Sequence, residues 1–314
     1  MGRTWWDMMR LEWGGHPFTL GRLVYLWKRK YGAGLRVAYY RDVVRPRILA
    51  TPPVPTPDRR CEIHVLTSDD DWLNLLWALK SFYRSSGCRF ALCIHDDGTL
   101  RPAACAQLRR AFPLARLIPR AEADLHVEPL LAGYSRCRAL RTGNRFSLKV
   151  FDFHAYLGAE RMLLLDSDVL FFARPAALLA LIADPECRLN SLNQDWRYGY
   201  SFPAGAGRPP LDFSLPPLIN YGLGLIHRGS APLAWIEEFL ALPGISHNPY
   251  VVEQTLAALC SGRFGYRMLP AEYDVHMGPR QPGVPLRHYA GPSRPLMYSE
   301  GIRDLVRDGF LDGP

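Results

Sequence analysis

Short apolar runs alternate with longer amphipathic stretches from residue 61 onward. Residues 63–66 and 90–94 have the length and composition of buried strands, whereas residues 72–83 and 103–111 have the spacing of helices. Strands that alternate with helices are typical of a mostly parallel sheet with helices on its faces. The pattern therefore predicts an α/β fold of the Rossmann-like kind, in which ligands gather at the carboxyl ends of the strands.

The N-terminal part of the chain has a different pattern. Residues 18–49 place Leu20, Leu23 and Trp27 among Lys and Arg side chains, as an amphipathic helix would, and four prolines between residues 52 and 57 end the pattern. Two hypotheses stay open: this helical appendage lies on a membrane surface, or it packs on the catalytic domain with a solvated basic face. We expect three parts, which are a basic segment at 1–57, the main domain at 61–297 and a tail at 298–314.

The distribution of charge supports this division. The 314 residues carry a formal charge of +8, and residues 1–60 hold 12 Lys/Arg against 4 Asp/Glu, which leaves 26 of each kind in the rest. A basic excess at one end suits an anionic surface, either lipid or nucleic acid. The sequence lacks the recognisable modules of nucleic-acid-binding proteins, so we expect no nucleic-acid partner.

The cysteines and the hydropathy bear on location. Seven cysteines occur without a C-x-x-C pair, and the early Arg, Asp and Glu residues spoil a secretory signal, which argues against a disulfide framework. No run of 18 or more apolar residues exists to span a membrane. We expect a cytoplasmic protein that is soluble or peripheral to the inner face of a membrane.

The sharpest chemical feature is Asp166-Ser167-Asp168, which follows the apolar run at 161–165. In an extended backbone alternate side chains share a face, so the two aspartates would point the same way. Two close carboxylates repel each other unless a hard divalent cation such as Mg²⁺ or Mn²⁺ neutralises them. The sequence thus predicts a metal site that can hold a diphosphate, and the alternative is a pair of solvated turn aspartates.

Five further motifs accompany this triplet. In this context residues 61–297 resemble the nucleotide-diphospho-sugar transferases of the GT-A fold, in particular the retaining glycosyltransferase family 8, which includes glycogenin and bacterial galactosyltransferases. The motifs follow the family order: Leu66-Thr67-Ser68-Asp69-Asp70-Asp71-Trp72, Phe146-Ser147-Leu148-Lys149, Asp166-Ser167-Asp168, Asn220-Tyr221-Gly222-Leu223-Gly224, Glu253-Gln254 and His288-Tyr289-Ala290-Gly291-Pro292-Ser293-Arg294-Pro295.

The resemblance implies a set of metal and diphosphate ligands. Asp166, Asp168 and His288 match the family's metal ligands, and family members usually use manganese. Lys149 matches the basic residue that reaches the sugar or the diphosphate, where an ammonium group stabilises the departing charge. Gly291 and Arg294 fall at the diphosphate. Arg294 stands where the family usually has Lys, and a guanidinium can also bind a diphosphate.

The resemblance also implies where the rest of the donor binds. Thr67, Asp69 and Trp72 match the nucleobase site, where an aromatic ring can stack on uracil. Asn220 and Gly222 match the sugar site, where glycine lets the backbone approach the ligand.

Three residues depart from the family pattern. Tyr221 is bulkier than the family's usual Ala or Ser, and Glu253-Gln254 replaces an Asp-Gln pair near the sugar's reactive carbon. The candidate catalytic groups are Glu253, Gln254 and Lys149. Arg294 is the third departure.

The implied activity is that of a metal-dependent, retaining hexosyltransferase. It would move a hexose from a UDP-sugar to a hydroxyl acceptor on a glycan or glycolipid, with Mn²⁺ or Mg²⁺ on the diphosphate. Two mechanisms stay open for such an enzyme: a carboxylate forms a covalent glycosyl-enzyme, or the acceptor attacks from the face that the diphosphate leaves. We favour the second, with Gln254 polarising the site.

Two other hypotheses about function fit part of the sequence. An apolar strand that ends in D-x-D-V is also found in haloacid dehalogenase-like phosphatases, which generally carry it on their first strand. The other reading is a non-catalytic glycan-binding protein with a degenerate transferase fold.

Overall fold

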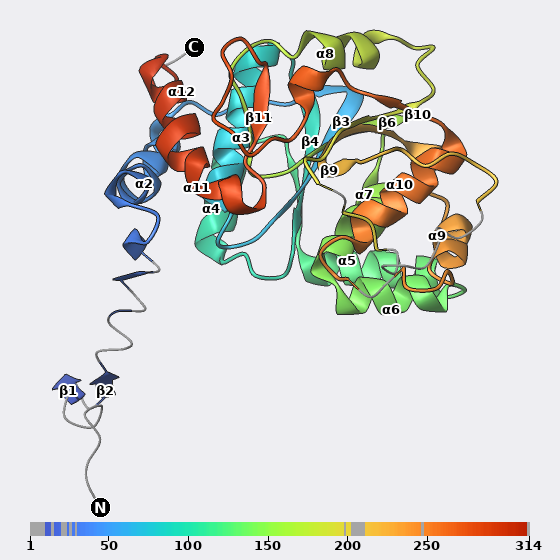
Figure 1. The fold of residues 1–314 in the computed structure, drawn as a ribbon, viewed down its shortest axis with the longest axis horizontal. Helices are drawn as coiled ribbons and strands as arrows, with labels where there is room; N and C mark the ends of the chain where they lie inside the picture. Colours follow the sequence, from blue (N-terminus) through green and yellow to red (C-terminus); the bar gives the residue numbers. More distant parts are fainter. Residues whose placement is uncertain are drawn as a thin grey trace, which may run out of the picture.

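A seven-stranded sheet forms the centre of the computed structural model, which describes residues 10–13, 16–19, 24, 27, 28, 30–197, 199–201, 211–245 and 248–312 (Figure 1). The sheet order is β10-β8-β9-β6-β3-β4-β5. Its strands are β3 (Asp58–Thr67), β4 (Phe90–Asp96), β5 (Arg116–Ile118), β6 (Arg161–Leu165), β8 (Asn190–Asn193), β9 (Asn220–His227) and β10 (Tyr266–Met268). Strands β3 to β6 are parallel, and β9 runs antiparallel to both of its neighbours, β6 and β8.

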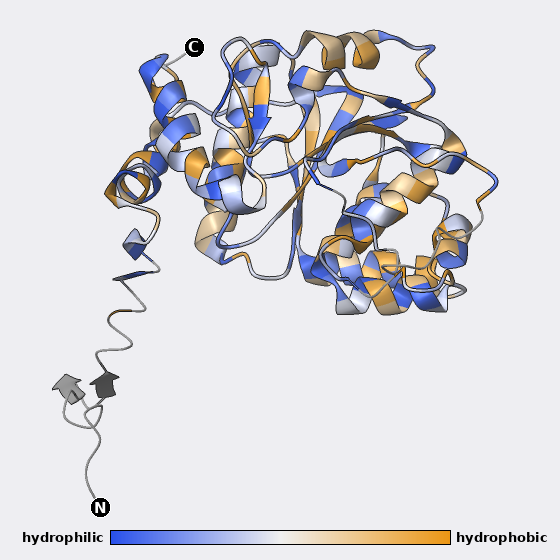
Figure 2. Cartoon of the chain, in the orientation of Figure 1, coloured by the Kyte–Doolittle hydropathy of each residue, from blue (hydrophilic) through white to orange (hydrophobic). Residues whose placement is uncertain are grey.

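Helices cover both faces of this sheet. The helices are α2 (Leu35–Tyr39), α3 (Trp72–Ser86), α4 (Pro102–Ala111), α5 (Arg120–Val127), α6 (Ser135–Gly143), α7 (Leu148–Tyr156), α8 (Ala176–Ala183), α9 (Leu233–Phe239), α10 (Val252–Phe264), α11 (Arg294–Leu296) and α12 (Arg303–Arg307). One core cluster packs α3, α4 and α8 on the sheet, and a second packs α5, α7, α9 and α10 on it. Figure 2 shows hydrophobic residues along the central strands and on the helices that flank them.

The strands predicted from the apolar runs are confirmed. The run at 161–165 forms β6, where Met162 and Leu164 face one core cluster and Leu163 and Leu165 face the other. Side chains alternate along a strand, so a central strand needs apolar residues at every position to serve both layers. The mostly parallel α/β fold follows from this arrangement, as the pattern predicted.

Among its described residues, the basic N-terminal segment does not form one long helix, because a turn at 32–34 interrupts it. Helix α2 continues as a π turn at Tyr40–Val44 and a 3-10 turn at Arg45–Ala50. One side of this segment packs into the main core through Val44 and Ile48, and its other side is exposed. Leu20, Leu23 and Leu26 lie outside the described residues. Farther towards the N-terminus, β1 (Arg10–Trp13) pairs with β2 (His16–Thr19).

The C-terminal residues join the same core. Tyr298, Ile302 and Phe310 are buried with Ile48 in the cluster that covers the α3 side of the sheet. The division of the chain at residues 57 and 297 therefore does not separate independent cores, and it stays a prediction about sequence segments. No helix among the described residues has the length and apolar character needed to cross a bilayer.

Candidate active site

The Asp166-Ser167-Asp168 triplet lies on a turn between β6 and β7 (Val169–Phe171). The N–H of Val169 donates to the carbonyl of Asp166 at 3.3 Å, which closes the turn. The extended backbone predicted for the triplet is therefore wrong, because the chain bends as it leaves the sheet. Strand β7 then pairs antiparallel with β11 (Leu286–His288), and this register sets His288 opposite Val169, close to both aspartates.

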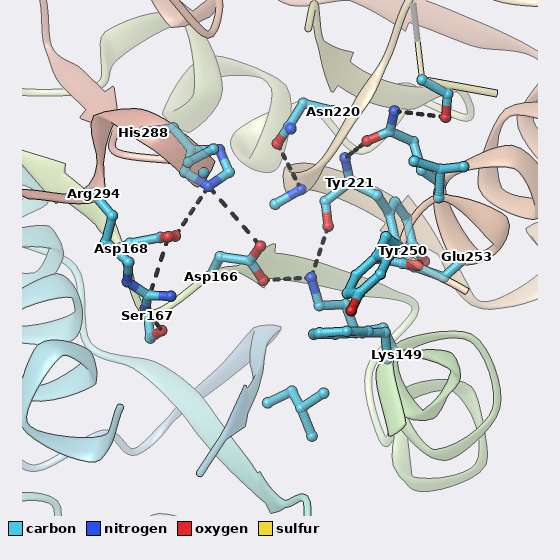
Figure 3. A pocket seen from close by; sticks show the side chains of 18 of the residues that line it. Lys149, Asp166, Ser167, Asp168, Asn220, Tyr221, Tyr250, Glu253, His288 and Arg294 are labelled. Atoms are coloured by element: carbon cyan, nitrogen blue, oxygen red, sulfur yellow. Dashed lines mark hydrogen bonds and ion pairs between the residues drawn. The ribbon is translucent and has the colours of Figure 1, made fainter. Parts of the chain in front are cut away.

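Three potential metal donors converge at this turn (Figure 3). Nε2 of His288 lies 3.0 Å from Oδ1 of Asp168 and 4.0 Å from Oδ2 of Asp166, and donor atoms of all three residues lie within 4.8 Å of one another. Burial alone would raise the pKa of Asp168, yet the charges of His288 and Arg294 hold it at about 2. Burial likewise opposes a charge on His288, but Asp168 raises its pKa. The charge of each of these side chains thus depends on its neighbours.

The absence of a side chain at Gly222 makes room for His288 and Asp166. A Cβ atom at position 222 would meet Cε1 of His288 and would lie 2.7 Å from Oδ2 of Asp166. The main chain here is also fixed, because Asp166 N–H donates to Gly222 O at 2.8 Å and Gly222 N–H donates to Asn220 Oδ1 at 3.0 Å. A side chain at this position would displace the donors, so glycine is required for close approach.

Lys149 places a cation beside the aspartates. Its Nζ lies 2.6 Å from Oδ1 of Asp166 and donates to the carbonyl of Tyr221 at 3.2 Å. Helix α7 carries Lys149 in its first turn, with only a small part of the side chain exposed. Burial opposes the ammonium charge, but Asp166 and then Glu253 raise the pKa of Lys149 above its usual value. The residue is therefore a charged lysine held inside the pocket.

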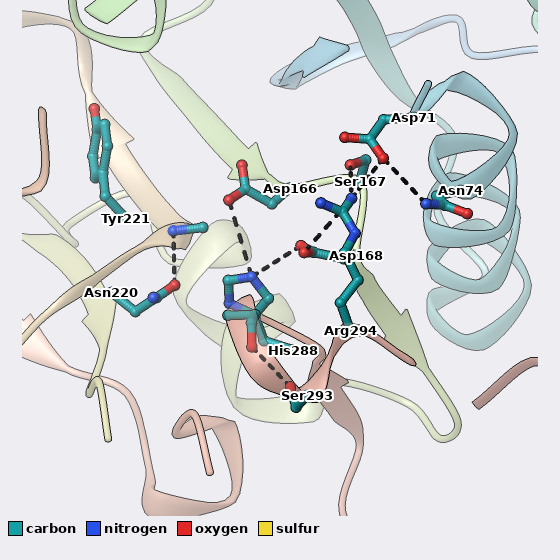
Figure 4. A network of polar contacts seen from close by, with 12 residues as sticks. Asp71, Asn74, Asp166, Ser167, Asp168, Asn220, Tyr221, His288, Ser293 and Arg294 are labelled. Atoms are coloured by element: carbon teal, nitrogen blue, oxygen red, sulfur yellow. Dashed lines mark hydrogen bonds and ion pairs between the residues drawn. The ribbon is translucent and has the colours of Figure 1, made fainter. Parts of the chain in front are cut away.

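Arg294 connects the triplet to the start of α3 (Figure 4). Its guanidinium lies 2.7 Å from Oδ1 of Asp71 and 3.8 Å from Oδ2 of Asp168, and it donates to Ser167 Oγ at 3.5 Å. Asp71 also accepts from Asn74 at 3.2 Å. Burial raises the pKa of Asp71, although Arg294 counteracts this effect. Arg294 thus faces the metal donors across a short gap.

The opposite wall of the pocket holds the predicted sugar-side residues. Gln254 Oε1 accepts from the Tyr221 N–H, and its Nε2 donates to Gly199 O, each at 3.4 Å. Glu253 precedes it in the first turn of α10, and its Oε2 is buried without a hydrogen-bond partner among the described residues. Burial raises the pKa of Glu253 to about 7, although nearby Lys149 lowers it. A buried carboxyl that titrates near neutrality is a common feature of active sites.

One open pocket of about 550 Å³ brings these residues together. Six carboxylates and four Lys/Arg side chains line it among the described residues, and His288 adds a basic group at the triplet. The carboxylates would repel a nucleoside diphosphate unless cations neutralised them. The lining acids are Asp71, Asp97, Asp166, Asp168, Asp195 and Glu253, and the lining cations are Arg145, Lys149, Arg197 and Arg294.

The predicted nucleobase residues do not all line this pocket. Thr67 lines it, and its buried Oγ1 has no hydrogen-bond partner among the described residues. Asp69 is paired with Arg101 at 2.6 Å, and Trp72 packs against the core; neither residue lines the pocket. The remaining predicted residues, Asn220, Gly222, Gly291 and Arg294, all line it.

Sequence reasoning missed several residues of the pocket wall. Asp195 accepts from Asn220 Nδ2 at 3.2 Å, and Arg145 lies 3.4 Å from Asp97. Asp195 comes two residues after the end of β8, so an acid after a strand is a signal that could have identified it. Tyr250 and Trp196 also line the pocket, but they lie in loops without a comparable signal.

Comparison with known proteins adds evidence about the fold. No family model matches the sequence, and no curated protein matches it either. Among solved structures, mouse xyloside xylosyltransferase 1 superposes with a TM-score of 0.50 at 14% identity, covering 75% of this chain and 98% of its own. The galactosyltransferase LgtC, solved with donor and acceptor sugar analogues, gives 0.45 at 16% identity, over 79% of this chain and 95% of its own. GlyE of Streptococcus pneumoniae gives 0.43 at 13% identity, over 81% and 64%.

At such low identity a match of this kind establishes the architecture. The seven-stranded, mostly parallel sheet with helices on both faces agrees with it. The chain therefore has the fold of the GT-A glycosyltransferases.

Proposed function

We propose that this protein is a retaining glycosyltransferase that moves a hexose from a UDP-sugar to a hydroxyl group of a glycan or glycolipid. The observation that carries the proposal is the convergence of Asp166, Asp168 and His288 beside Lys149 in one pocket of a GT-A fold. The order of the sequence motifs supports the same activity. The glycosyltransferases among the structural neighbours are consistent with it.

The donor set fits a divalent metal. Two carboxylates and one imidazole nitrogen suit Mn²⁺, and the absence of a side chain at Gly222 makes room for two of them, Asp166 and His288. Asp166, Asp168 and His288 would hold the ion, which would bind the diphosphate and reduce its negative charge.

The chain's own cations would act on the same diphosphate. Lys149 keeps a charged ammonium group next to Asp166, and Arg294 faces Asp168 from the other side. Both groups are positioned before the donor binds, so they need little reorganisation when charge develops on the leaving group. We assign Lys149 to stabilising the departing diphosphate and Arg294 to binding it.

Retention of configuration follows if the acceptor hydroxyl attacks from the side that the diphosphate leaves. The departing phosphate oxygen then takes the proton of that hydroxyl. Gln254 is held between the Tyr221 N–H and Gly199 O, so its amide can polarise the sugar side of the pocket. Glu253 would supply a nearby negative charge when it is ionised.

Ligand-induced stabilisation tests the proposal. We expect UDP-sugars with Mn²⁺ to raise the melting temperature, because a ligand that binds only the folded state stabilises it. The Asp168→Ala variant should lose this shift and the transferase activity while it stays folded, and Asp184→Ala, at an exposed site outside the pocket, should keep both. Full activity of Asp168→Ala would contradict the proposal, as would phosphate release from simple phosphomonoesters without nucleotide-sugar binding.

We further propose a cytoplasmic enzyme that meets an anionic membrane through its N-terminal segment. Leu35, Tyr39 and Val43 are spaced by four residues and are 75%, 54% and 56% exposed. Lysine and arginine side chains flank this stripe. The chain's seven cysteines are free thiols, which is consistent with the reducing cytoplasm. An exposed apolar stripe with basic neighbours is typical of helices that lie in the headgroup region.

Vesicle sedimentation of the full chain tests the membrane contact. We expect binding to anionic phospholipid vesicles that weakens in salt, because the basic side chains contribute through screened charges. A double variant, Leu35→Ser with Tyr39→Ser, should bind less. Leu125→Ser, which removes an exposed leucine from α5, should bind as the parent does. No sedimentation of the parent at low salt would remove this proposal.

A further inference from the structure

A second cluster of potential metal ligands lies on one face of the sheet, and it is separate from the pocket. Nδ1 of His64 lies 3.1 Å from Nε2 of His95, and Sγ of Cys93 lies 3.3 Å from the same Nε2. All three donor atoms lie within 4.8 Å of one another, and each of the three residues is at least 99% buried. None of them lines the candidate active site.

The strand register explains why these side chains meet. His64 of β3 pairs directly with Cys93 of β4, and His95 follows two residues later on the same face. Ile63, Val65 and the other alternate residues of these strands face the opposite core cluster. Most buried sheet faces are apolar, so a nitrogen and sulfur cluster at this position is unusual.

Hydrogen bonds fix which lone pairs point into the cluster. Nε2 of His64 lies 3.3 Å from Oε2 of Glu62, and Glu62 is itself held by the Gly158 N–H at 2.7 Å and by Arg116 at 3.1 Å. Glu62, held beside a guanidinium, accepts a hydrogen bond from the Nε2–H of His64, so the lone pair of His64 Nδ1 points at His95.

With both imidazoles neutral, the three residues cannot satisfy one another through hydrogen bonds alone. If His95 Nε2 carries the proton, it bonds His64, but then the thiol of Cys93 has no acceptor in this cluster. If His95 Nδ1 carries the proton, two lone pairs face each other at 3.1 Å.

A metal ion removes the conflict between these lone pairs. Zinc bonds of ~2.0–2.1 Å to nitrogen and ~2.3 Å to sulfur place neighbouring donors of a tetrahedron roughly 3.3–3.6 Å apart. The separations of His95 Nε2 from His64 Nδ1 and from Cys93 Sγ, 3.1 and 3.3 Å, are close to these edges. Glu62 on the far nitrogen of His64 matches the carboxylate that orients zinc-bound histidines. Phe153 of α7 covers both imidazole rings at centroid distances of 5.4 and 4.6 Å.

We propose that His64, Cys93 and His95 bind a structural Zn²⁺ ion that joins β3 to β4 beneath the pocket. The thiol of Cys93 loses its proton to solvent as the Zn–S bond forms, and the two imidazoles bind as neutral ligands. Because the cluster is closed by the sheet and α7, the ion enters as the chain folds. The assignment is independent of the glycosyltransferase proposal.

Cobalt substitution tests the site in the full chain. Protein produced in medium supplemented with Co²⁺ should retain about one equivalent of cobalt after dialysis against a chelator, as one site predicts. It should also show a sulfur-to-cobalt charge-transfer band in the near ultraviolet. Asp166, Asp168 and His288 offer only oxygen and nitrogen, so the candidate active site cannot produce that band.

Two buried cysteines on opposite faces of the sheet provide matched variants. Cys93→Ala should lose the band, whereas Cys61→Ala, which removes a fully buried thiol from the other core, should keep it. Absence of the band in the parent would overturn the assignment without reliance on any variant. Persistence of the band in Cys93→Ala, or its loss from both variants, would also overturn it.

Discussion

Lys149 Nζ lies 2.6 Å from Asp166 Oδ1 and 3.2 Å from the carbonyl oxygen of Tyr221, so one ammonium group joins α7 to the ends of β6 and β9. The contact gives Lys149 two roles in the proposed enzyme. It orients a metal-binding carboxylate before the donor arrives, and it can turn towards the diphosphate once an ion shares the charge of Asp166.

Replacement of Lys149 by methionine should therefore reduce kcat by about 10²–10³, the usual effect of removing one group that stabilises transition-state charge. Steady-state rates with a saturating UDP-sugar measure this. Lys80→Met is the control, because Lys80 is also buried but bonds to Thr51 and Pro52 away from the pocket. Equal losses of kcat in the two folded variants would contradict the assigned role.

Gly222→Ala should weaken Mn²⁺-dependent nucleotide binding. The added Cβ would meet His288 and Asp166, and overpacking of this kind costs about 1–3 kcal/mol, or roughly 5- to 150-fold in affinity. Calorimetry with UDP and Mn²⁺ measures the change. Gly229→Ala, where a Cβ meets nothing within 4 Å, should bind as the parent does. Unchanged affinity in Gly222→Ala would show that the metal lies elsewhere.

Glu253→Gln should change how stability depends on pH. The folded pKa of about 7 exceeds the ordinary value of 4.5, so the folded state holds this proton more tightly than the unfolded state does. The parent therefore loses stability as pH rises from about 4.5 to 7, by on the order of 3 kcal/mol. The variant has no carboxyl to ionise and should gain on the parent over that interval.

Melting temperatures of both proteins across pH 4 to about 8 test this expectation. Glu122→Gln, at an exposed position on α5, is the control and should track the parent at every pH. A difference between Glu253→Gln and the parent that does not vary with pH would show that folding does not raise the pKa of Glu253.

Arg294→Ala should weaken UDP binding by about 10- to 100-fold, since charge-assisted hydrogen bonds contribute about 1.5–3 kcal/mol. Arg294→Lys should lose less, because an ammonium group keeps the charge although it cannot span Asp71 and Asp168 as the guanidinium does. Titration calorimetry with UDP in the presence of Mn²⁺ compares the three proteins. If the lysine variant binds as poorly as the alanine variant, bridging of the two aspartates matters more than charge.

The fold was largely predictable because buried central strands need apolar residues, and such apolar runs are visible in the sequence. Residues 161–165 are apolar at every position since β6 serves two cores, and this pattern shows directly in the sequence. The position of His288 was not predictable from local pattern. It reaches Asp168 only through the pairing of β11 with β7, which joins segments more than a hundred residues apart.

The nucleobase end of the site shows the same limit. Asp69 and Asp71 are equally plausible from the sequence, since both follow the first strand. Arg101 engages Asp69, and Arg294 engages Asp71 at the pocket. Partners from other elements therefore decide which of the two acids faces the pocket. Local spacing could not distinguish the two.

The pairing of β7 with β11 also has a consequence for biosynthesis. Two of the three proposed metal ligands leave the ribosome near the middle of the chain, and the third follows 120 residues after Asp168. Until residue 288 has emerged, Asp166 and Asp168 have no imidazole beside them. The nascent chain can thus complete most of its sheet while it still lacks the means to hold the ion, so catalytic competence would await the synthesis of β11.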